Sequence, residues 1–376
     1  RTNGRYPARG RGKFPRSGHL ERSGSADPEQ RFDLRFEGKV ERMADILPGA
    51  EGNFHVQGTL KGQALQPDVD LTLQASALKF EGYQVSKLNG KIKADLSEQG
   101  KLDADIKASE IRIQKEKINS ASLRIQGNTD QHTLNLAVSG TPGKAWLAAT
   151  GGLNEQTWQG RLTQLSLEQD QFGKWAIAQP ADLRLSGKEA TLSGFTLKHK
   201  NLNIALNGTW KQEKGWQVES AVDDFALKLL QEWQLPVPAL DGTAKAHLTA
   251  QGKGALPEQA EFSLDLPKLT LTTESFEDDR EEIGTTVWIW TKNNVTARLR
   301  NKTAILEAQT QFQDKSSASL KATVKNCYDF SKPEKMPLSG QLDLHLKDLS
   351  PIAHLSDEAV QATGKFGGRI LLGGTV

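Results

Sequence analysis

The stretch QLDLHLKDL at residues 341–349 alternates apolar and polar side chains. Successive side chains of an extended strand point to opposite faces. Leu342, Leu344 and Leu346 therefore share one face, and the polar residues between them share the other. Such alternation is typical of antiparallel sheets in which one face is packed and the other meets water. The stretch predicts an antiparallel strand with one dry face.

The same alternation returns along most of the chain. From about Phe32 onward, extended segments follow one another at intervals of roughly 8 to 14 residues, and Gly, Asn, Asp, Ser or Pro separate them. There are about 20 such segments, which predicts an all-β fold. The apolar positions of the clearest strands, which we expect to share one continuous surface, are Val69, Leu71, Leu73, Leu102, Ile106, Leu134, Leu136, Val138, Leu202, Ile204, Leu206, Phe262, Leu264, Leu266, Leu342, Leu344 and Leu346.

The composition favours a thin apolar layer over several thick cores. Hydrophobic residues make up 36% of the chain, and aromatic residues only 6%. About 20 strands, spaced about 4.7 Å apart and about 18 Å wide, present a dry face of roughly 1,600 Å². A soluble monomer rarely exposes more than a few hundred Å² of contiguous apolar surface, so this face must pack on itself, meet a partner or enclose an apolar ligand. The pattern leaves three architectures open: a row of β-sandwiches, a curled single-sheet groove, and a closed β-helix.

The charge distribution separates a basic N-terminal tail from the rest of the chain. Residues 1–31 contain eight Arg and Lys against three Asp and Glu, whereas the whole chain carries a net charge of +2. The remaining body is slightly acidic, which argues against nucleic-acid binding through counterion release. We expect the tail to be disordered or a cloning remnant, with a basic arm that seeks a membrane or a partner as the alternative.

Behind the tail we expect three parts. Two β-groove segments over residues 32–222 and 236–376 flank a short helix at 223–235, and the second segment is cut short at its C-terminal end. A second short helix is expected over 350–360. The sequence contains no apolar run of about 18 residues or more, so no transmembrane helix is predicted. We expect the chain to be an interior piece of a longer protein.

Residues that could carry chemistry are scattered. Seven His residues stand singly, and no two have the i, i+4 spacing that presents a metal-binding pair on one helix face. The acidic run FEDDREE at 276–282 lacks the ligand alternation of a calcium loop, so we expect a solvated loop. Cys327 is the single cysteine, which excludes an intramolecular disulfide. We therefore expect no enzyme activity, no catalytic or metal site, and no cofactor.

The stretch VWIW at residues 287–290 departs from the one-sided pattern. Val287 and Ile289 point to one face, and two Trp residues point to the other. We expect both faces to be covered there, either by a neighbouring segment or at an interaction surface.

Internal units and two longer stretches carry a family resemblance. The segments from Gly52 and from Gly242 share the order glycine, alternating strand, glycine pair, proline, alternating strand. The stretch LPGAEGNFHVQGTLKGQALQPDVDLTLQASALKFEGYQVSKLNGKIKADL at 47–96, followed by SASLRIQGNTDQHTLNLAVSG at 120–140, resembles the TamB family of translocation and assembly modules and the wider AsmA-like group. The resemblance covers most of residues 32–376.

The resemblance implies an elongated, curled antiparallel β-sheet groove of the β-taco type, with one or two short helices. Such proteins are anchored in the inner membrane of Gram-negative bacteria and cross the periplasm. They meet TamA, an outer-membrane barrel of the Omp85 class. The implied function is to carry phospholipid acyl chains between the membranes and to support outer-membrane protein assembly and secretion. The expected partners are therefore phospholipid and TamA, the latter through parts of the protein outside this segment.

Two other functions stay open on the residues themselves. A structural or adhesive array of β-sandwiches would bury the apolar face within the protein and carry no lipid. A polysaccharide-acting enzyme on a β-helix would need a cluster of carboxylates on one exposed face.

Overall fold

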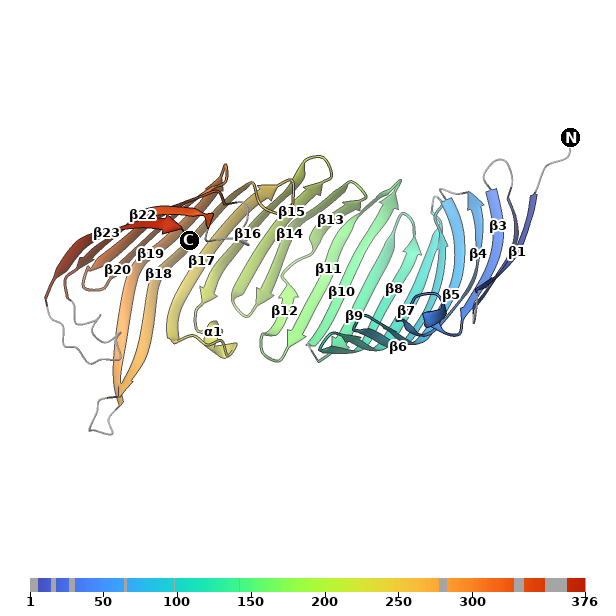
Figure 1. Cartoon of the computed structure of the whole chain (residues 1–376), viewed down its shortest axis with the longest axis horizontal. Coiled ribbons are helices and arrows are strands. Elements are labelled where there is room, and N and C mark those ends of the chain that lie inside the picture. The colour runs from blue at the N-terminus through green and yellow to red at the C-terminus, as the bar shows by residue number, and fades with distance from the viewer. Residues whose placement is uncertain are drawn as a thin grey trace. The chain divides into compact units, whose positions relative to one another are not determined.

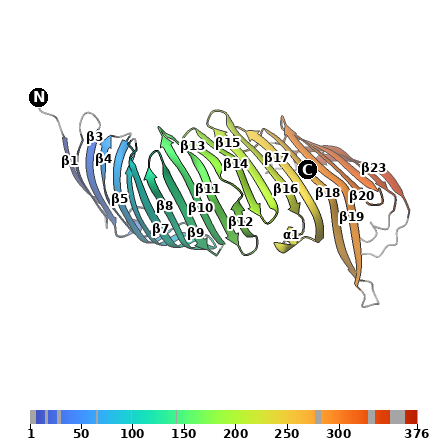
Figure 2. The same ribbon diagram turned by 180° about the vertical axis from the view of Figure 1, so that it is seen from behind.

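The computed structural model describes residues 6–14, 18–26, 31–63, 66–97, 99–141, 143–276, 283–327, 335–348 and 364–375. The chain forms two compact units, Arg1–Gly187 and Lys188–Val376. Within each unit the curved strands lie side by side (Figures 1 and 2). Each is described here by itself.

The first unit is an antiparallel meander, in which each strand from β1 to β11 pairs with the next one along the chain. At its end, β11 pairs with both β12 and β13, which share its length between them. A 3-10 turn, η1, lies at Met43–Asp45 between β3 and β4. The strands are β1 Tyr6–Phe14, β2 Gly18–Ala26, β3 Arg31–Val40, β4 Glu51–Gln63, β5 Gln66–Phe80, β6 Tyr83–Asp95, β7 Lys101–Ile113, β8 Glu116–Asn128, β9 His132–Gly140, β10 Gly143–Asn154, β11 Thr157–Gln169, β12 Gly173–Ile177 and β13 Ala181–Ser186.

The second unit repeats this arrangement, and its strands from β14 to β23 also pair one after another in antiparallel order. One helical turn, α1 at Leu229–Glu232, lies between β16 and β17. The strands are β14 Glu189–His199, β15 Leu202–Lys211, β16 Gly215–Ala226, β17 Ala239–Gly252, β18 Gln259–Phe276, β19 Ile283–Arg300, β20 Thr303–Phe312, β21 Ser317–Lys325, β22 Pro337–Leu346 and β23 Phe366–Thr375.

Tight turns between long strands set the register of the meander. Phe80 pairs with Tyr83, so only Glu81 and Gly82 connect β5 to β6. Both connecting residues have positive φ, 46° and 85°. Two successive positive φ angles are the signature of the primed turns whose twist matches that of paired strands, which is why a glycine occupies the second position.

The expected all-β, antiparallel architecture with almost no helix is confirmed. Within the described residues of each unit the pairing forms a single layer, and no second sheet packs on it. Among the residues that the structure describes, few side chains are buried, and the cluster of buried side chains formed by Leu299, Cys327 and Met336 is small. This is not the packing of a β-sandwich, in which two sheets enclose a continuous core.

The structure differs from the expected helix at 223–235. The helix expected at 223–235 occupies only Leu229–Glu232, because Phe225 and Ala226 pair with β17 as the last residues of β16. Strand pairing between distant residues thus overrides the local helical spacing. The two compact units meet in the sequence between Gly187 and Lys188. The helix expected at 350–360 lies outside the described residues.

Two further expectations concern the ends of the chain and its membrane segments. The basic tail expected to be disordered contains β1 and β2, which pair with each other, and β2 pairs with β3. Pairing uses backbone groups, so it does not require apolar side chains. In the described part of the chain, no helix has the length and apolar character needed to cross a membrane.

Candidate functional site

Pairing register gathers the apolar positions of unit 1 onto one face of its sheet. Directly paired residues of an antiparallel sheet project to the same side, so a row of successive partners traces one face. One row crosses the strands from β5 to β11 through Leu71, Ile92, Ala104, Ile125, Leu134, Ala149 and Leu162. The neighbouring row crosses them through Leu73, Gly90, Ile106, Leu123, Leu136, Leu147 and Leu165.

This face, which we call apolar face 1, contains every lining position that the sequence predicts in unit 1. All of them are partly buried and none is enclosed. They are Val69, Leu71, Leu73, Leu102, Ile106, Leu134, Leu136 and Val138.

Unit 2 has an equivalent surface, apolar face 2. One row from β15 to β23 runs through Ile204, Val222, Ala246, Leu264, Val295, Ala308, Leu320, Leu342 and Ile370. Leu202 and Leu346, at 2% and 7% exposed, are buried, whereas the other predicted positions on this face are only partly buried. The predicted positions on apolar face 2 are Leu202, Ile204, Leu206, Phe262, Leu264, Leu266, Leu342, Leu344 and Leu346.

The opposite face of each sheet is polar. In unit 2 charged residues occur on four neighbouring strands, where Glu261 pairs with Arg298 and Glu307 pairs with Lys321. The Arg298 Nε–Glu261 Oε1 and Lys321 Nζ–Glu307 Oε1 distances are 2.9 and 2.6 Å. A hydrogen bond from Lys321 lowers the pKa of Glu307 below its ordinary value. These exposed pairs keep one side of the sheet wet, so only the other side is available to apolar ligands.

A histidine and a tryptophan form a polar contact on apolar face 1 that the sequence analysis missed. His132 is 8% exposed, and its Nδ1 lies 2.9 Å from the backbone oxygen of Asn128. A carbonyl only accepts, so Nδ1 carries the hydrogen and Nε2 is free to accept. The indole Nε1–H of Trp158 donates to that Nε2 over 2.8 Å. The contact fixes the ring of Trp158 near the end of the strands.

Buried polar side chains on apolar face 2 are likewise satisfied. Asn293, at 8% exposed, donates from Nδ2 to the backbone oxygen of Leu266 over 2.9 Å. Its Oδ1 accepts a hydrogen bond from the hydroxyl of Thr310. Asn293 lies where the register between β19 and β20 shifts, so its side chain supplies contacts that the interrupted ladder lacks. The Asn293–Asn294 pair in the sequence gave no signal of this role.

Tryptophans of the VWIW stretch lie on apolar face 2, because the register shift between Thr291 and Asn294 moves them to the same face as Val295. Trp288 and Trp290 pair with Leu271 and Leu269. Their rings stack with centroids 6.3 Å apart, and the ring of Trp290 lies 5.3 Å from that of Phe312. Trp288 is 6% exposed, whereas Val287 on the other face is 55% exposed. The face opposite the tryptophans is therefore exposed at Val287, contrary to the expectation that both faces are covered.

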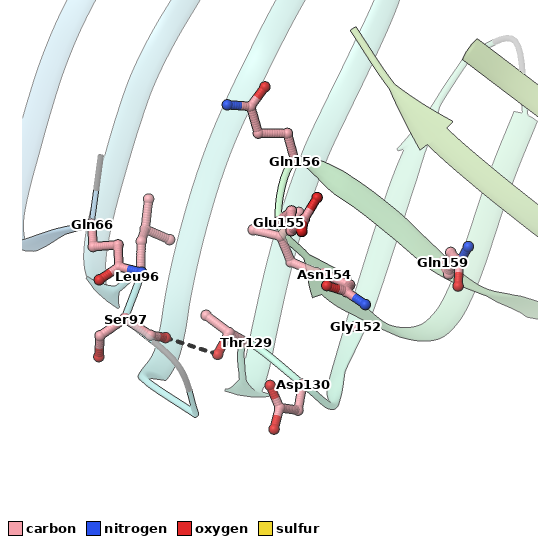
Figure 3. Close-up of a pocket in the computed structure, with 11 residues that line it drawn as sticks. Gln66, Leu96, Ser97, Thr129, Asp130, Gly152, Asn154, Glu155, Gln156 and Gln159 are labelled. Atoms are coloured by element: carbon pink, nitrogen blue, oxygen red, sulfur yellow. Dashed lines mark hydrogen bonds between the residues drawn. The ribbon is translucent and has the colours of Figure 1, made fainter. Parts of the chain in front are cut away.

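A polar hollow of about 740 Å³ opens at the strand ends of unit 1 (Figure 3). Three connections line it, namely those from β6 to β7, from β8 to β9 and from β10 to β11. The hydroxyl of Thr129 donates to the backbone oxygen of Ser97 over 3.0 Å, as Figure 3 shows, and ties two of these connections together. Asp130 and Glu155 contribute acidic groups to the lining. The hollow is a wet margin beside the end of apolar face 1 that contains His132.

Side chains suited to metal binding or nucleophilic chemistry do not converge in the described ranges. No group of three His, Cys, Asp or Glu residues there could hold a metal ion. Cys327 is 5% exposed and packs with Leu299 and Met336, and its thiol donates to the backbone oxygen of Val324 over 3.3 Å. This environment is that of a packed side chain. Most of the acidic run at 276–282 lies outside the described residues.

Comparison with known proteins supports one family. The family described as "TamB, N-terminal domain" matches residues 17–376. The chain is also similar to the translocation and assembly module subunit TamB of Haemophilus influenzae, with 26% identity over 155 residues, which is 40% of this chain and 12% of that protein. The chain thus spans a small part of the length of that relative. No solved structure matches the chain.

Proposed function

The chain belongs to the TamB family and is part of a translocation and assembly module subunit, and from that premise we propose that its apolar faces bind phospholipid acyl chains in transit between two membranes. In this proposal the segment lies in the periplasm, as part of a protein anchored in the inner membrane. The observation that carries it is the continuous apolar row on one side of a single-layered sheet.

The size of apolar face 1 supports the binding of an apolar ligand. The seven strands from β5 to β11, at about 4.7 Å spacing and with four side chains along each strand, give an area on the order of 700 Å². The largest apolar patch on a typical monomer is about 300 to 600 Å². Because no second layer covers the described part of this face, an acyl chain is a ligand of suitable chemistry.

The energetics of acyl-chain binding favour movement along the apolar face over tight binding at one position. Each buried methylene contributes about 0.8 kcal/mol without any directional requirement. Rows of Leu, Ile, Val and Ala present similar contacts at every strand, so an acyl chain loses little when it moves from one strand to the next. The head group would stay at the strand ends, where the polar hollow beside Thr129 provides hydrogen-bonding groups.

We further propose that the whole protein supports outer-membrane protein assembly together with TamA. The name of the Haemophilus relative, a subunit of a translocation and assembly module, supports this role. Described residues of this segment offer no distinct site for the barrel, so we place the contact elsewhere in the protein. The alternative is a structural array that carries no lipid. It requires that the protein itself covers the apolar face, and the single layer of strands argues against such a cover.

Photocrosslinking in the full-length protein tests the proposal. A benzophenone side chain at Leu136 on apolar face 1 is expected to capture phospholipid, whereas the same group at Asn135, its neighbour on the polar face, is expected to capture little. Lipid extraction and mass spectrometry identify the adduct. Equal capture at the two positions, or capture at neither, contradicts the proposal.

A further inference from the structure

Residues 227–238 connect β16 to β17 and contain α1, and we call them the strap. Two of their side chains are buried, whereas half of the strap residues are exposed. Leu227 and Leu229 are 6% and 4% exposed. The backbone N–H of Leu227 donates to the oxygen of Gly242 over 3.0 Å, and that of Leu235 donates to Leu230 over 3.0 Å. The strap is therefore an ordered segment.

The strap covers one end of apolar face 2. The Trp233 ring lies 6.0 Å from the ring of His199 and 5.9 Å from that of Phe225. Both residues project from this face, because His199 pairs with Leu202 and Phe225 pairs with Ala244. Leu202 and Ala244 are only 2% and 6% exposed, whereas Leu264 and Val295 further along the face are partly buried. Leu202 is thus the most buried of these side chains, although Trp288 and Leu346 elsewhere on this face are also buried.

An exposed ion pair fastens the strap. Lys200 Nζ bonds to the carboxylate of Glu232, and the two side chains are 59% and 43% exposed. The hydrogen bond lowers the pKa of Glu232 below its ordinary value. Such a pair contributes little to stability, so it can hold a segment in place and still release it.

We propose that the strap is a gate that controls the access of lipid to one end of apolar face 2. This proposal rests on the lipid-binding function proposed above. In the closed state Trp233 occupies the end of apolar face 2 formed by Leu202, Phe225 and Ala244. Lipid acyl chains reach this end only when the Lys200–Glu232 pair opens and Trp233 leaves the face. The strap would then set how far along unit 2 a lipid advances.

Site-specific photocrosslinking in the full-length protein tests the gate. Phe225 and Phe262 lie on the same face, the first in contact with Trp233 and the second away from it, so each can carry the same benzophenone group. We expect lipid adducts at position 262 and few at position 225. Lys200→Glu should raise adducts at position 225 about two- to fivefold, the range for loss of an exposed ion pair. Trp233→Ala should raise them further, and neither change should alter position 262.

A charge swap separates the gate from a general loosening of the fold. Lys200→Glu combined with Glu232→Lys should return the yield at position 225 to that of the unchanged protein. Equal yields at positions 225 and 262 in the unchanged protein, or no response to Lys200→Glu and Trp233→Ala, overturn the gate.

A second measurement does not depend on lipid. Single cysteines at Ala244→Cys, below the strap, and at Ala297→Cys, on the same face further along, are labelled with a small apolar maleimide. Lys200→Glu should speed labelling at position 244 about two- to fivefold and leave position 297 unchanged. If no lipid is captured anywhere, the proposed function fails, and this labelling still decides whether the strap opens. An unchanged rate at position 244 overturns the gate.

Discussion

Trp158 of β11 donates its indole N–H to Nε2 of His132 in β9 across 2.8 Å, over the intervening strand β10. The glycine at position 151 of β10 makes room for this contact, because a Cβ there would lie 2.6 Å from Cζ2 of Trp158. Gly160 faces the same ring at the same distance, from its own Cβ position to Cη2. The end of apolar face 1 is therefore built around one aromatic side chain.

Gly151→Ala should destabilise the protein by about 1 to 3 kcal/mol, because the added methyl group overlaps the Trp158 ring and the backbone oxygen of Gln159. Chemical denaturation measures the effect. Gly187→Ala is the matched control, because nothing lies within 4 Å of its Cβ position. Equal effects of the two substitutions would contradict the packing of Trp158 described above.

His132→Phe should cost about 1 to 3 kcal/mol, because it removes the acceptor of the Trp158 N–H and leaves the Asn128 oxygen without that partner. His247→Phe is the control, because that histidine is exposed on the polar face. Denaturation midpoints compare the two variants. A tolerated His132→Phe would show that the hydrogen bond adds nothing to packing.

Leu71→Asp should reduce lipid captured on apolar face 1 by about tenfold, because a carboxylate replaces contacts with roughly two methylenes. Folding should persist, since Leu71 is only partly buried. Thr72→Asp places the same charge on the polar face and should leave lipid binding unchanged. Circular dichroism and lipid mass spectrometry report on the two properties. Global unfolding of Leu71→Asp would instead indicate a closed core, as in a sandwich.

Leu202→Ala should destabilise the protein by about 2 to 5 kcal/mol, because the side chain is 2% exposed and its loss leaves a cavity in apolar face 2. Leu371→Ala removes the same atoms from a side chain that is 76% exposed, and should change stability by less than about 0.5 kcal/mol. Thermal unfolding of both variants tests this difference. Similar unfolding temperatures would mean that Leu202 is not enclosed.

Glu307 should make its contribution to stability at pH values above its ordinary pKa of 4.5. Its folded-state pKa is lowered by the hydrogen bond from Lys321, so folding favours the ionised form. The contribution is therefore lost as the pH falls below about 4.5 and through the folded-state pKa. Glu307→Gln should flatten the acid side of the stability profile slightly, because the pair is exposed. An identical dependence of stability on pH for both proteins would show that Glu307 makes no such contribution.

The fold class could be read from residues because strand alternation is local and has a period of two. Leu342, Leu344 and Leu346 share a face in any extended conformation, and the structure shows this alternation in strand after strand. The helical spacing of apolar residues at 223–233 predicted the local structure less well. Helix formation there competes with backbone pairing to β17, and that pairing depends on residues outside 223–233.

The sequence by itself determined that this protein is made of one-sided antiparallel strands, because side-chain direction follows from backbone geometry alone. Only the tertiary structure decided which positions meet across strands. Register placed His132 against Trp158, and the course of the connection between β16 and β17 brought Trp233 over Phe225. These contacts depend on turn lengths and bulges that shift whole strands against each other, and no local pattern in the residues encodes the partner of a given side chain.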